Sequence, residues 1–195
     1  VFVIHGGPGA GCSPYMRQFF NPEQYLIVLH DQRGCGKSKP NAELEENNTQ
    51  ELVKDIERLR EKLNLDKIIL FGGSWGTTLS LTYAEEYPEN VNAMVLRGIY
   101  LGTQEEIDMN YPRLKSYFPE LYQNCMNLMP ELTSELNDSV IFSLSQTLPF
   151  NEWKKYLIAR DKLDLRALML NPDDNYSDEF YNSEENLKWL NTMYA

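Results

Sequence analysis

The stretch that decides the fold runs from Lys67 to Glu86 and reads KIILFGGSWGTTLSLTYAEE. Its first five residues form the apolar run of a buried strand, and the residues from Thr77 onward have a helical pattern that stops before Pro88. Between them lies Gly72-Gly73-Ser74-Trp75-Gly76, a G-x-S-x-G sequence at a strand-to-helix corner. Glycines two positions before and after Ser74 allow the sharp turn that exposes a hydroxyl, so Ser74 is predicted to be a nucleophile.

The residues around this corner alternate between apolar strands and amphipathic helices. Val1 to His5, Tyr25 to His30 and Asn92 to Leu96 are predicted strands. Asn48, three residues before Glu51, is a capping-box-like start of a helix. The apolar positions on one face of this helix are Leu52, Val53, Ile56, Leu59 and Leu63. Strands that alternate with helices predict an α/β fold with a mostly parallel sheet and crossover helices.

After Gly98 the pattern changes to helices separated by prolines and rich in aromatic residues. We therefore expect two regions, an α/β core over residues 1–98 and a helical region over residues 99–195. The acidic stretch from Pro172 to Asn186 contains no basic residue and is predicted to be a solvated loop.

Composition excludes several classes of protein. The 195 residues fit one domain of ordinary size, and 42% of them are hydrophobic, which is enough for a core. A net charge of −11 disfavours nucleic acid and anionic membranes as partners. Three cysteines without paired spacing argue against a disulfide framework and a zinc site. No apolar run approaches the roughly 20 residues of a membrane span, so a cytoplasmic protein is predicted.

A glycine-rich turn follows the first predicted strand as His5-Gly6-Gly7-Pro8-Gly9. Acyl transfer on this architecture needs a backbone N–H there to stabilise the developing oxyanion. Gly7 lies two residues past the strand and has no side chain to block a carbonyl, so it is the predicted first donor. The N–H of Trp75, the residue after the nucleophile, is the predicted second donor. His5 itself is predicted to bind loop backbone rather than to transfer protons.

Gly36-Lys37-Ser38 resembles the end of a P-loop, which would indicate nucleotide binding. A Walker A loop requires glycine at position 31, where this chain has Asp31, so the alternative fails on spacing. We instead expect Asp31 and Arg33 to form an ion pair that fixes the loop.

Four segments together closely resemble the prolyl iminopeptidases, serine aminopeptidases of the α/β-hydrolase fold. They are His5–Gly9, Asp31–Ser38, Gly72–Leu79 and Leu96–Tyr100, and the resemblance is dense to about Leu101 and thin beyond. It implies an α/β-hydrolase fold with a partial helical cap, and release of an N-terminal residue, preferentially proline, from small peptides. The implied chemistry is an acyl-enzyme on Ser74 with Gly7 and Trp75 as the oxyanion hole. It implies no cofactor and no metal.

The chain departs from the family pattern in its histidines. The family's triad runs Ser, Asp, His along the sequence, but His5 and His30 both precede Ser74. The chain also starts at Val1 inside a strand pattern. We therefore expect a fragment whose triad Asp and His lie outside it, and which is inactive alone.

A second departure concerns the substrate amine. The family's cap carries a W-x-x-W-E motif whose glutamate receives the amine. Alignment by eye places Trp153 and Tyr156 at the two tryptophans and Leu157 at the glutamate. Trp153 and Tyr156 are therefore predicted substrate-binding residues. Asp161 is the nearby acid that could replace it.

Two alternatives therefore stay open, a general serine esterase or amidase of the same fold and a non-catalytic truncated chain. An epoxide hydrolase or haloalkane dehalogenase is disfavoured because those enzymes use Asp at the elbow, where this chain has Ser74.

Overall fold

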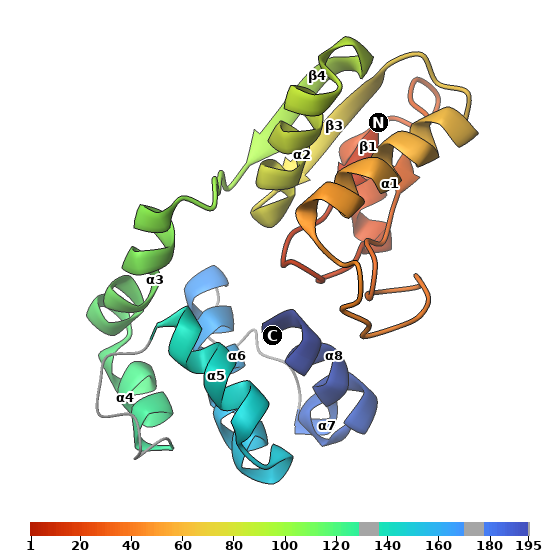
Figure 1. Cartoon of the computed structure of the whole chain (residues 1–195). Coiled ribbons are helices and arrows are strands. Elements are labelled where there is room, and N and C mark those ends of the chain that lie inside the picture. The colour runs from red at the N-terminus through yellow and green to blue at the C-terminus, as the bar shows by residue number, and fades with distance from the viewer. Residues whose placement is uncertain (129–136, 170–177, 195) are drawn as a thin grey trace. The chain divides into compact units, whose positions relative to one another are not determined.

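The computed structural model describes residues 1–128, 137–169 and 178–194 (Figure 1). The chain divides into two compact units, Val1–Gly102 and Thr103–Ala195, four residues beyond the boundary expected at residue 98. Every strand among the described residues belongs to the first unit, and the described residues of the second unit form only helices and their connections.

The first unit is built on a four-stranded parallel sheet. Its strands are β1 (Phe2–Ile4), β2 (Val28–Leu29), β3 (Ile68–Gly73) and β4 (Val91–Arg97), in the order β2-β1-β3-β4. Val3 is paired with Phe71, and Gly73 is paired with Arg97, so the carboxyl ends of β1, β3 and β4 meet at one edge. The predicted α/β class with a parallel sheet is confirmed.

Two helices cover one face of this sheet (Figure 1). They are α1 (Thr49–Lys62) and α2 (Trp75–Glu86), and short 3-10 helices, η1 (Pro14–Phe19) and η2 (Pro88–Asn90), complete the unit. The shared core consists of buried apolar residues from the strands and both helices: Phe2, Ile4, Leu70, Leu52, Val53, Ile56, Leu79 and Tyr83. The apolar stripe predicted for the first helix therefore faces the sheet, as its spacing indicated.

The start of α1 is capped by one half of the expected capping box. The Asn48 side chain accepts the Glu51 N–H at 3.0 Å. The Glu51 carboxylate, however, accepts from Lys54 at 2.7 Å and from Arg33 at 3.3 Å. The Glu51 carboxylate therefore forms ion pairs and does not bind the backbone N–H of Asn48, which is the other half of a capping box.

A buried carboxylate ties α1 to the end of α2. Glu57 accepts from the Tyr83 hydroxyl at 2.7 Å, from Arg60 at 2.6 Å and from Asn90 at 3.1 Å. These charge-assisted bonds hold the pKa of Glu57 below its usual range, with the Arg60 bonds as the largest cause. The network fixes the helix that carries Ser74 at its amino end.

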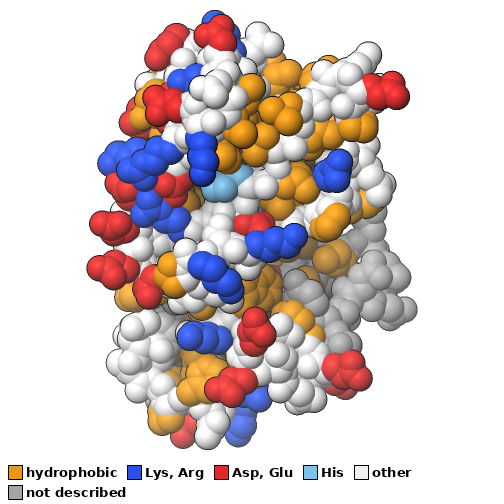
Figure 2. Space-filling model, turned by 90° about the vertical axis from the view of Figure 1, so that its right-hand side faces the viewer, with side chains coloured by type: hydrophobic (Ala, Val, Ile, Leu, Met, Phe, Trp, Pro, Cys, Tyr) orange, Lys and Arg blue, Asp and Glu red, His pale blue; other side chains and the backbone are white. Residues whose placement is uncertain are grey.

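The other face of the sheet carries an aromatic cluster. The ring of Phe71 on β3 packs against those of Phe19 and Phe20, with centroids 5.2 Å apart in both pairs. Tyr15, whose ring contacts that of Phe19, is 61% exposed, and elsewhere in this unit Leu26 is 58% exposed. Figure 2 shows such hydrophobic areas on the surface, in orange, among charged side chains.

The second predicted strand is wrong in length. Tyr25 to His30 was predicted to be a strand, whereas only Val28–Leu29 pairs, at an edge of the sheet. An edge strand has one hydrogen-bonded neighbour, and β1 offers only three residues to pair with. Before Val28 the Val1 amino group still donates to the Leu26 carbonyl at 2.6 Å, but only Val28 and Leu29 form ladder pairs.

The second unit is helical throughout its described residues. Its helices are α3 (Gln104–Tyr117), α4 (Pro119–Asn127), α5 (Asp138–Thr147), α6 (Phe150–Leu168), α7 (Asp178–Asn182) and α8 (Glu184–Tyr194). Their core includes Trp153, Tyr156, Leu157, Leu163 and Leu190. Over the described parts of the chain, no helix is both long and apolar enough to cross a membrane.

The acidic stretch from Pro172 to Asn186 is not the loop that was predicted. Residues 172–177 lie outside the described residues, but α7 and the first turn of α8 occupy most of the remainder. Tyr181 is the physical reason, because it is only 4% exposed and anchors α7 in the helical core. Acidic residues in the first turns of both helices are favourable to the helix dipole.

Candidate active site

Ser74 lies on a strained turn between β3 and α2. Its backbone has φ 55° and ψ −126°, a region that side-chain-bearing residues rarely occupy and that costs about 1 to 3 kcal/mol. The side chain is exposed at this turn. Its N–H donates to the Arg97 carbonyl on β4 at 3.1 Å, and its carbonyl accepts the Thr77 N–H at 2.8 Å. Strand and helix together therefore hold the serine outward, as a nucleophile elbow requires.

The glycines of the elbow are required by steric contact rather than by turn flexibility. A Cβ on Gly76 would overlap the carbonyl oxygen of Ile4, because α2 begins directly against β1. A Cβ on Gly72 would lie 2.5 Å from the Gly76 carbonyl oxygen and 2.6 Å from Ser80 Oγ. The close approach of helix and strand thus explains why the motif has glycine on both sides of Ser74.

The glycine-rich loop after β1 lies against Ser74. A Cβ on Gly6 would be 2.9 Å from the Gly73 carbonyl oxygen and 3.2 Å from Ser74 Cβ, so only glycine permits this approach. Gly7 has φ 118°, a conformation that favours glycine, and the loop closes with the Ala10 N–H donating to the Gly6 carbonyl at 3.2 Å. The loop is therefore adjacent to the nucleophile, as an oxyanion loop must be.

The two predicted oxyanion donors occupy suitable backbone positions. Gly7 belongs to the loop beside Ser74, and Trp75 is the first residue of α2. An N–H at this helix position has no intrahelical acceptor, and the helix dipole favours negative charge there. The roles of Gly7 and Trp75 stay predictions.

His5 is a buried ligand of loop backbone. It is 2% exposed, its Nε2 accepts the Gln32 N–H at 3.0 Å, and its Nδ1 lies 2.9 Å from the Gly6 carbonyl oxygen. The Gly11 N–H also lies 3.3 Å from Nδ1, so both ring nitrogens contact backbone groups of the loops. Burial lowers the pKa of His5 below its usual 6.5. The predicted structural role is confirmed, and neither nitrogen is available to take a proton from Ser74.

The buried His5 makes the stability of the first unit depend on pH. A histidine whose folded pKa is lowered binds fewer protons folded than unfolded, so the free energy of unfolding falls as the pH drops below about 6.5. Burial shifts His30 the same way, whereas the charge of Asp31 opposes the shift of His5. We expect the urea midpoint to fall from about pH 7 to about pH 5, and to fall less in His5→Gln. An equal fall in both proteins would contradict this assignment.

The loop after β2 is held differently from the prediction. Arg33 binds Asp55 at 2.5 Å and Glu51 at 3.3 Å, both on α1, and does not pair with Asp31. The Asp31 carboxylate accepts the N–H groups of Cys12 at 2.6 Å and Lys37 at 2.9 Å. The expected ion pair is wrong because α1 presents two carboxylates to Arg33, while Asp31 caps backbone donors of its own loop.

The substrate-binding residues predicted in the helical region lie in its core. Trp153 is 2% exposed and donates its indole N–H to Asn191 at 2.6 Å, and Tyr156 stacks on it with centroids 5.2 Å apart. Leu157 is fully buried beside them, and Asp161 is buried and accepts the Tyr181 hydroxyl at 2.8 Å. Contact of these side chains with a substrate stays a prediction.

Two residues near Ser74 have no predicted role in the sequence analysis. Gly6 makes the closest approach of the loop to the nucleophile, and the side-chain hydroxyl of Thr77 contacts the Ser74 carbonyl at 2.7 Å. The sequence signal for Gly6 is the run of two glycines, which does not reveal which of them faces the serine.

Across the described residues, no group of three or more potential metal ligands occurs.

A serine elbow at the carboxyl edge of a parallel sheet, with a glycine loop beside it, defines the class of protein. The alpha/beta hydrolase fold family matches residues 1–183, and the chain belongs to this family.

Within that family the chain is most informatively compared with proline iminopeptidases. It is 42% identical over 177 residues to the proline iminopeptidase of Arabidopsis thaliana. The matched segment covers 89% of this chain and 46% of that protein. It is 42% identical over 170 residues to that of Neisseria meningitidis serogroup A, covering 81% of this chain and 55% of that protein. The resemblance to this family is confirmed, and the chain spans about half the length of these relatives.

The fold also agrees with a solved structure. The crystal structure of a proline iminopeptidase from Mycobacterium smegmatis matches 99% of this chain and 60% of its own, with a TM-score of 0.59 at 15% identity. This likeness supports the fold.

Proposed function

We propose that the intact protein is a serine aminopeptidase that releases an N-terminal residue, preferentially proline, from small peptides. The observation that carries the proposal is Ser74, exposed on a strained elbow with a glycine loop against it. The identity of 42% to proteins named proline iminopeptidase supports the substrate class.

In the proposed reaction, Ser74 Oγ attacks the carbonyl carbon of the N-terminal residue and forms a tetrahedral intermediate. The negative oxygen receives hydrogen bonds from the N–H groups of Gly7 and Trp75, which act on charge that develops only in the transition state. The serine proton passes to a general base and then to the leaving amine as the peptide bond breaks. Water next attacks the acyl-enzyme, returns a proton through the base, and releases the free residue.

The general base is proposed to be a histidine outside residues 1–195. The chain holds two histidines, and both ring nitrogens of His5 face backbone groups. Since the chain covers 46% of one relative and 55% of another, the remainder of an intact protein is the proposed source of the base and of its orienting carboxylate. The proposed chemistry uses no metal and no cofactor.

A general serine esterase or amidase is the second candidate, and Leu157 favours it. The alignment by eye puts this residue at the position of the family's amine-binding glutamate, and it is fully buried among apolar neighbours. An ammonium group taken from water without a carboxylate partner costs several kcal/mol, so an enzyme lacking that acid would not prefer free amines. Asp161 is the alternative acid of the same helix, and its bond to Tyr181 holds it in the core.

Comparison of proline anilide with N-acetylproline anilide in the intact protein separates the two candidates. The aminopeptidase proposal predicts that kcat/KM for the free amine exceeds that for the acetylated substrate by about 100-fold or more, because a site built for a charged group rejects its neutral analogue. Equal values would favour the esterase or amidase. Absence of turnover on both anilides and on simple esters would favour a non-catalytic chain.

A further inference from the structure

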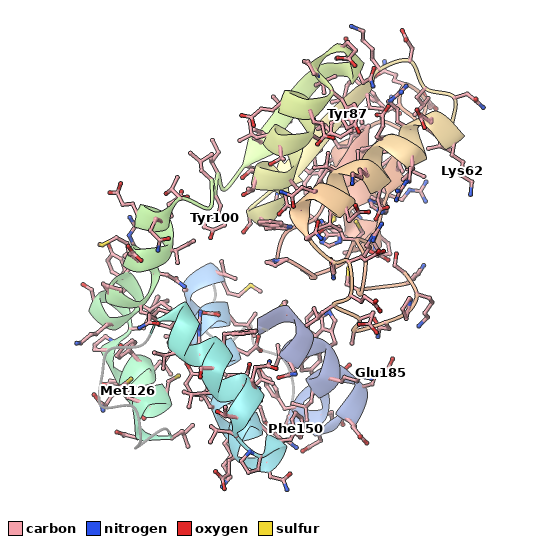
Figure 3. The ribbon with its side chains drawn as sticks, in the orientation of Figure 1. Lys62, Tyr87, Tyr100, Met126, Phe150 and Glu185 are labelled. Carbon is pink, nitrogen blue, oxygen red and sulfur yellow. The ribbon has the colours of Figure 1, made fainter. Side chains whose placement is uncertain are left out.

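The hydroxyl of Thr77 joins the nucleophile to the segment that leaves β4. Its Oγ1 lies 2.7 Å from the Ser74 carbonyl oxygen and 2.8 Å from the Tyr100 carbonyl oxygen, and it accepts the Tyr100 N–H at 2.9 Å. The Thr77 residue is fully buried. Figure 3 labels Tyr100 on the segment after β4. One side chain therefore contacts two parts of the chain that both border the elbow.

The single proton of this hydroxyl is available to Ser74. The neighbouring Thr78 hydroxyl already donates to the Tyr100 carbonyl at 2.6 Å. The Tyr100 N–H occupies a lone pair of Thr77 Oγ1, and of the two carbonyl oxygens within reach of the Thr77 proton the one of Ser74 is the nearer, at 2.7 Å against 2.8 Å for Tyr100. The Ser74 carbonyl then accepts two bonds from one residue, through the Thr77 N–H at 2.8 Å and through its hydroxyl.

Ser74 needs such restraint because its backbone conformation is disfavoured. A residue at φ 55° and ψ −126° keeps this geometry only where its surroundings impose it. The N–H of Ser74 is held by Arg97 on β4, and its carbonyl is held by Thr77 on α2. Loss of either contact would let the Ser74 backbone rotate and would move Ser74 Oγ out of its position for attack.

We propose that Thr77 is a positioning residue, whose buried hydroxyl fixes the carbonyl of Ser74 and thereby aims the nucleophile. The proposal rests on the proposed function for its kinetic consequence. The hydroxyl is buried and contacts backbone groups, so its effect on the reaction passes through Ser74. A small misplacement of a reacting group lowers the rate of the chemical step more than it weakens substrate binding, so the effect falls on kcat.

The test compares hydroxyl deletions in the intact protein with proline anilide as substrate. Thr77→Val, which keeps the branched shape, is expected to lower kcat by about 10- to 100-fold with KM unchanged within about threefold. Thr77→Ser restores the hydroxyl and is expected to restore most of kcat. Thr77→Cys, with a weak donor of similar size, is measured in parallel and is expected to show the loss even if the valine variant does not fold.

Two neighbouring threonines serve as matched controls. Thr78→Val removes a bond to the Tyr100 carbonyl without touching Ser74, and Thr82→Val removes a bond within α2, to the Thr78 carbonyl at 2.9 Å. Both are expected to keep kcat within about threefold of the wild type. Equal losses in Thr77→Val and Thr78→Val would overturn the proposal, because anchoring of Tyr100 would explain both. An unchanged kcat in Thr77→Val would overturn it as well.

Amide hydrogen exchange separates this proposal from the proposed function. If the wild-type protein shows no turnover, the proposed function fails, while the position of the Ser74 carbonyl is still measurable. The N–H of residue 77 binds that carbonyl, so it is expected to exchange at least about tenfold faster in Thr77→Val than in Thr78→Val. Equal exchange in the two variants would overturn the role of the hydroxyl.

Discussion

Ser74→Ala is expected to lower kcat of the intact protein on proline anilide by about a millionfold, the size of effect that loss of the nucleophile has in serine proteases. Without the hydroxyl no acyl-enzyme forms, and only the weak catalysis of the oxyanion donors and of binding remains. The measurement is steady-state turnover, with thermal unfolding to show that the variant is folded.

The matched control for this variant is Ser143→Ala. Ser143 is an exposed serine on α5, and removal of its hydroxyl is expected to leave turnover unchanged. A Ser74→Ala protein that retains turnover within tenfold of the wild type would show that another residue attacks the substrate.

Gly76→Ala is expected to reduce the free energy of unfolding by about 3 kcal/mol, or to prevent folding. A methyl group there meets the backbone carbonyl of Ile4 and lies 3.0 Å from that of His5. Backbone in the middle of a sheet cannot move aside as a flexible side chain can, so α2 must shift away from β1. The measurement is the urea midpoint of the chain followed by tryptophan fluorescence.

Gly73→Ala supplies the comparison within the same motif. Its methyl group would meet the Arg97 guanidinium at 3.0 Å, which is the end of a long side chain on the edge strand. That side chain can shift at small cost, so the free energy of unfolding is expected to stay within about 1 kcal/mol of the wild-type value. Equal losses in the two variants would show that glycine is needed at the elbow for backbone flexibility instead of close packing.

Much of the core was predictable because periodicity and motif agreed. The apolar run before Gly72 and the helical run after Ser74 specify β3 and α2, and a G-x-S-x-G at their junction specifies the elbow. Hydrophobic pattern also identifies α1, since its buried residues recur at helical spacing. These patterns are local, so they predict an element without knowledge of the residues that pack against it.

The errors arose where distant residues decide the outcome. The length of β2 depends on how many residues of β1 stand beside it, and the partner of Arg33 depends on where α1 places Asp55. The packing of Gly6 against Ser74 and the hydrogen bond between Thr77 and Tyr100 likewise join residues that are far apart in the sequence. None of these contacts leaves a pattern in the sequence nearby.

The central claim is that Ser74 is the reactive nucleophile, and a covalent probe tests it most directly. The intact protein is treated with an activated phosphonate, and the modified residue is located by mass spectrometry of peptides. We expect a single adduct, on Ser74, and no adduct in Ser74→Ala. An adduct on a different residue, or labelling that persists in Ser74→Ala, would contradict it.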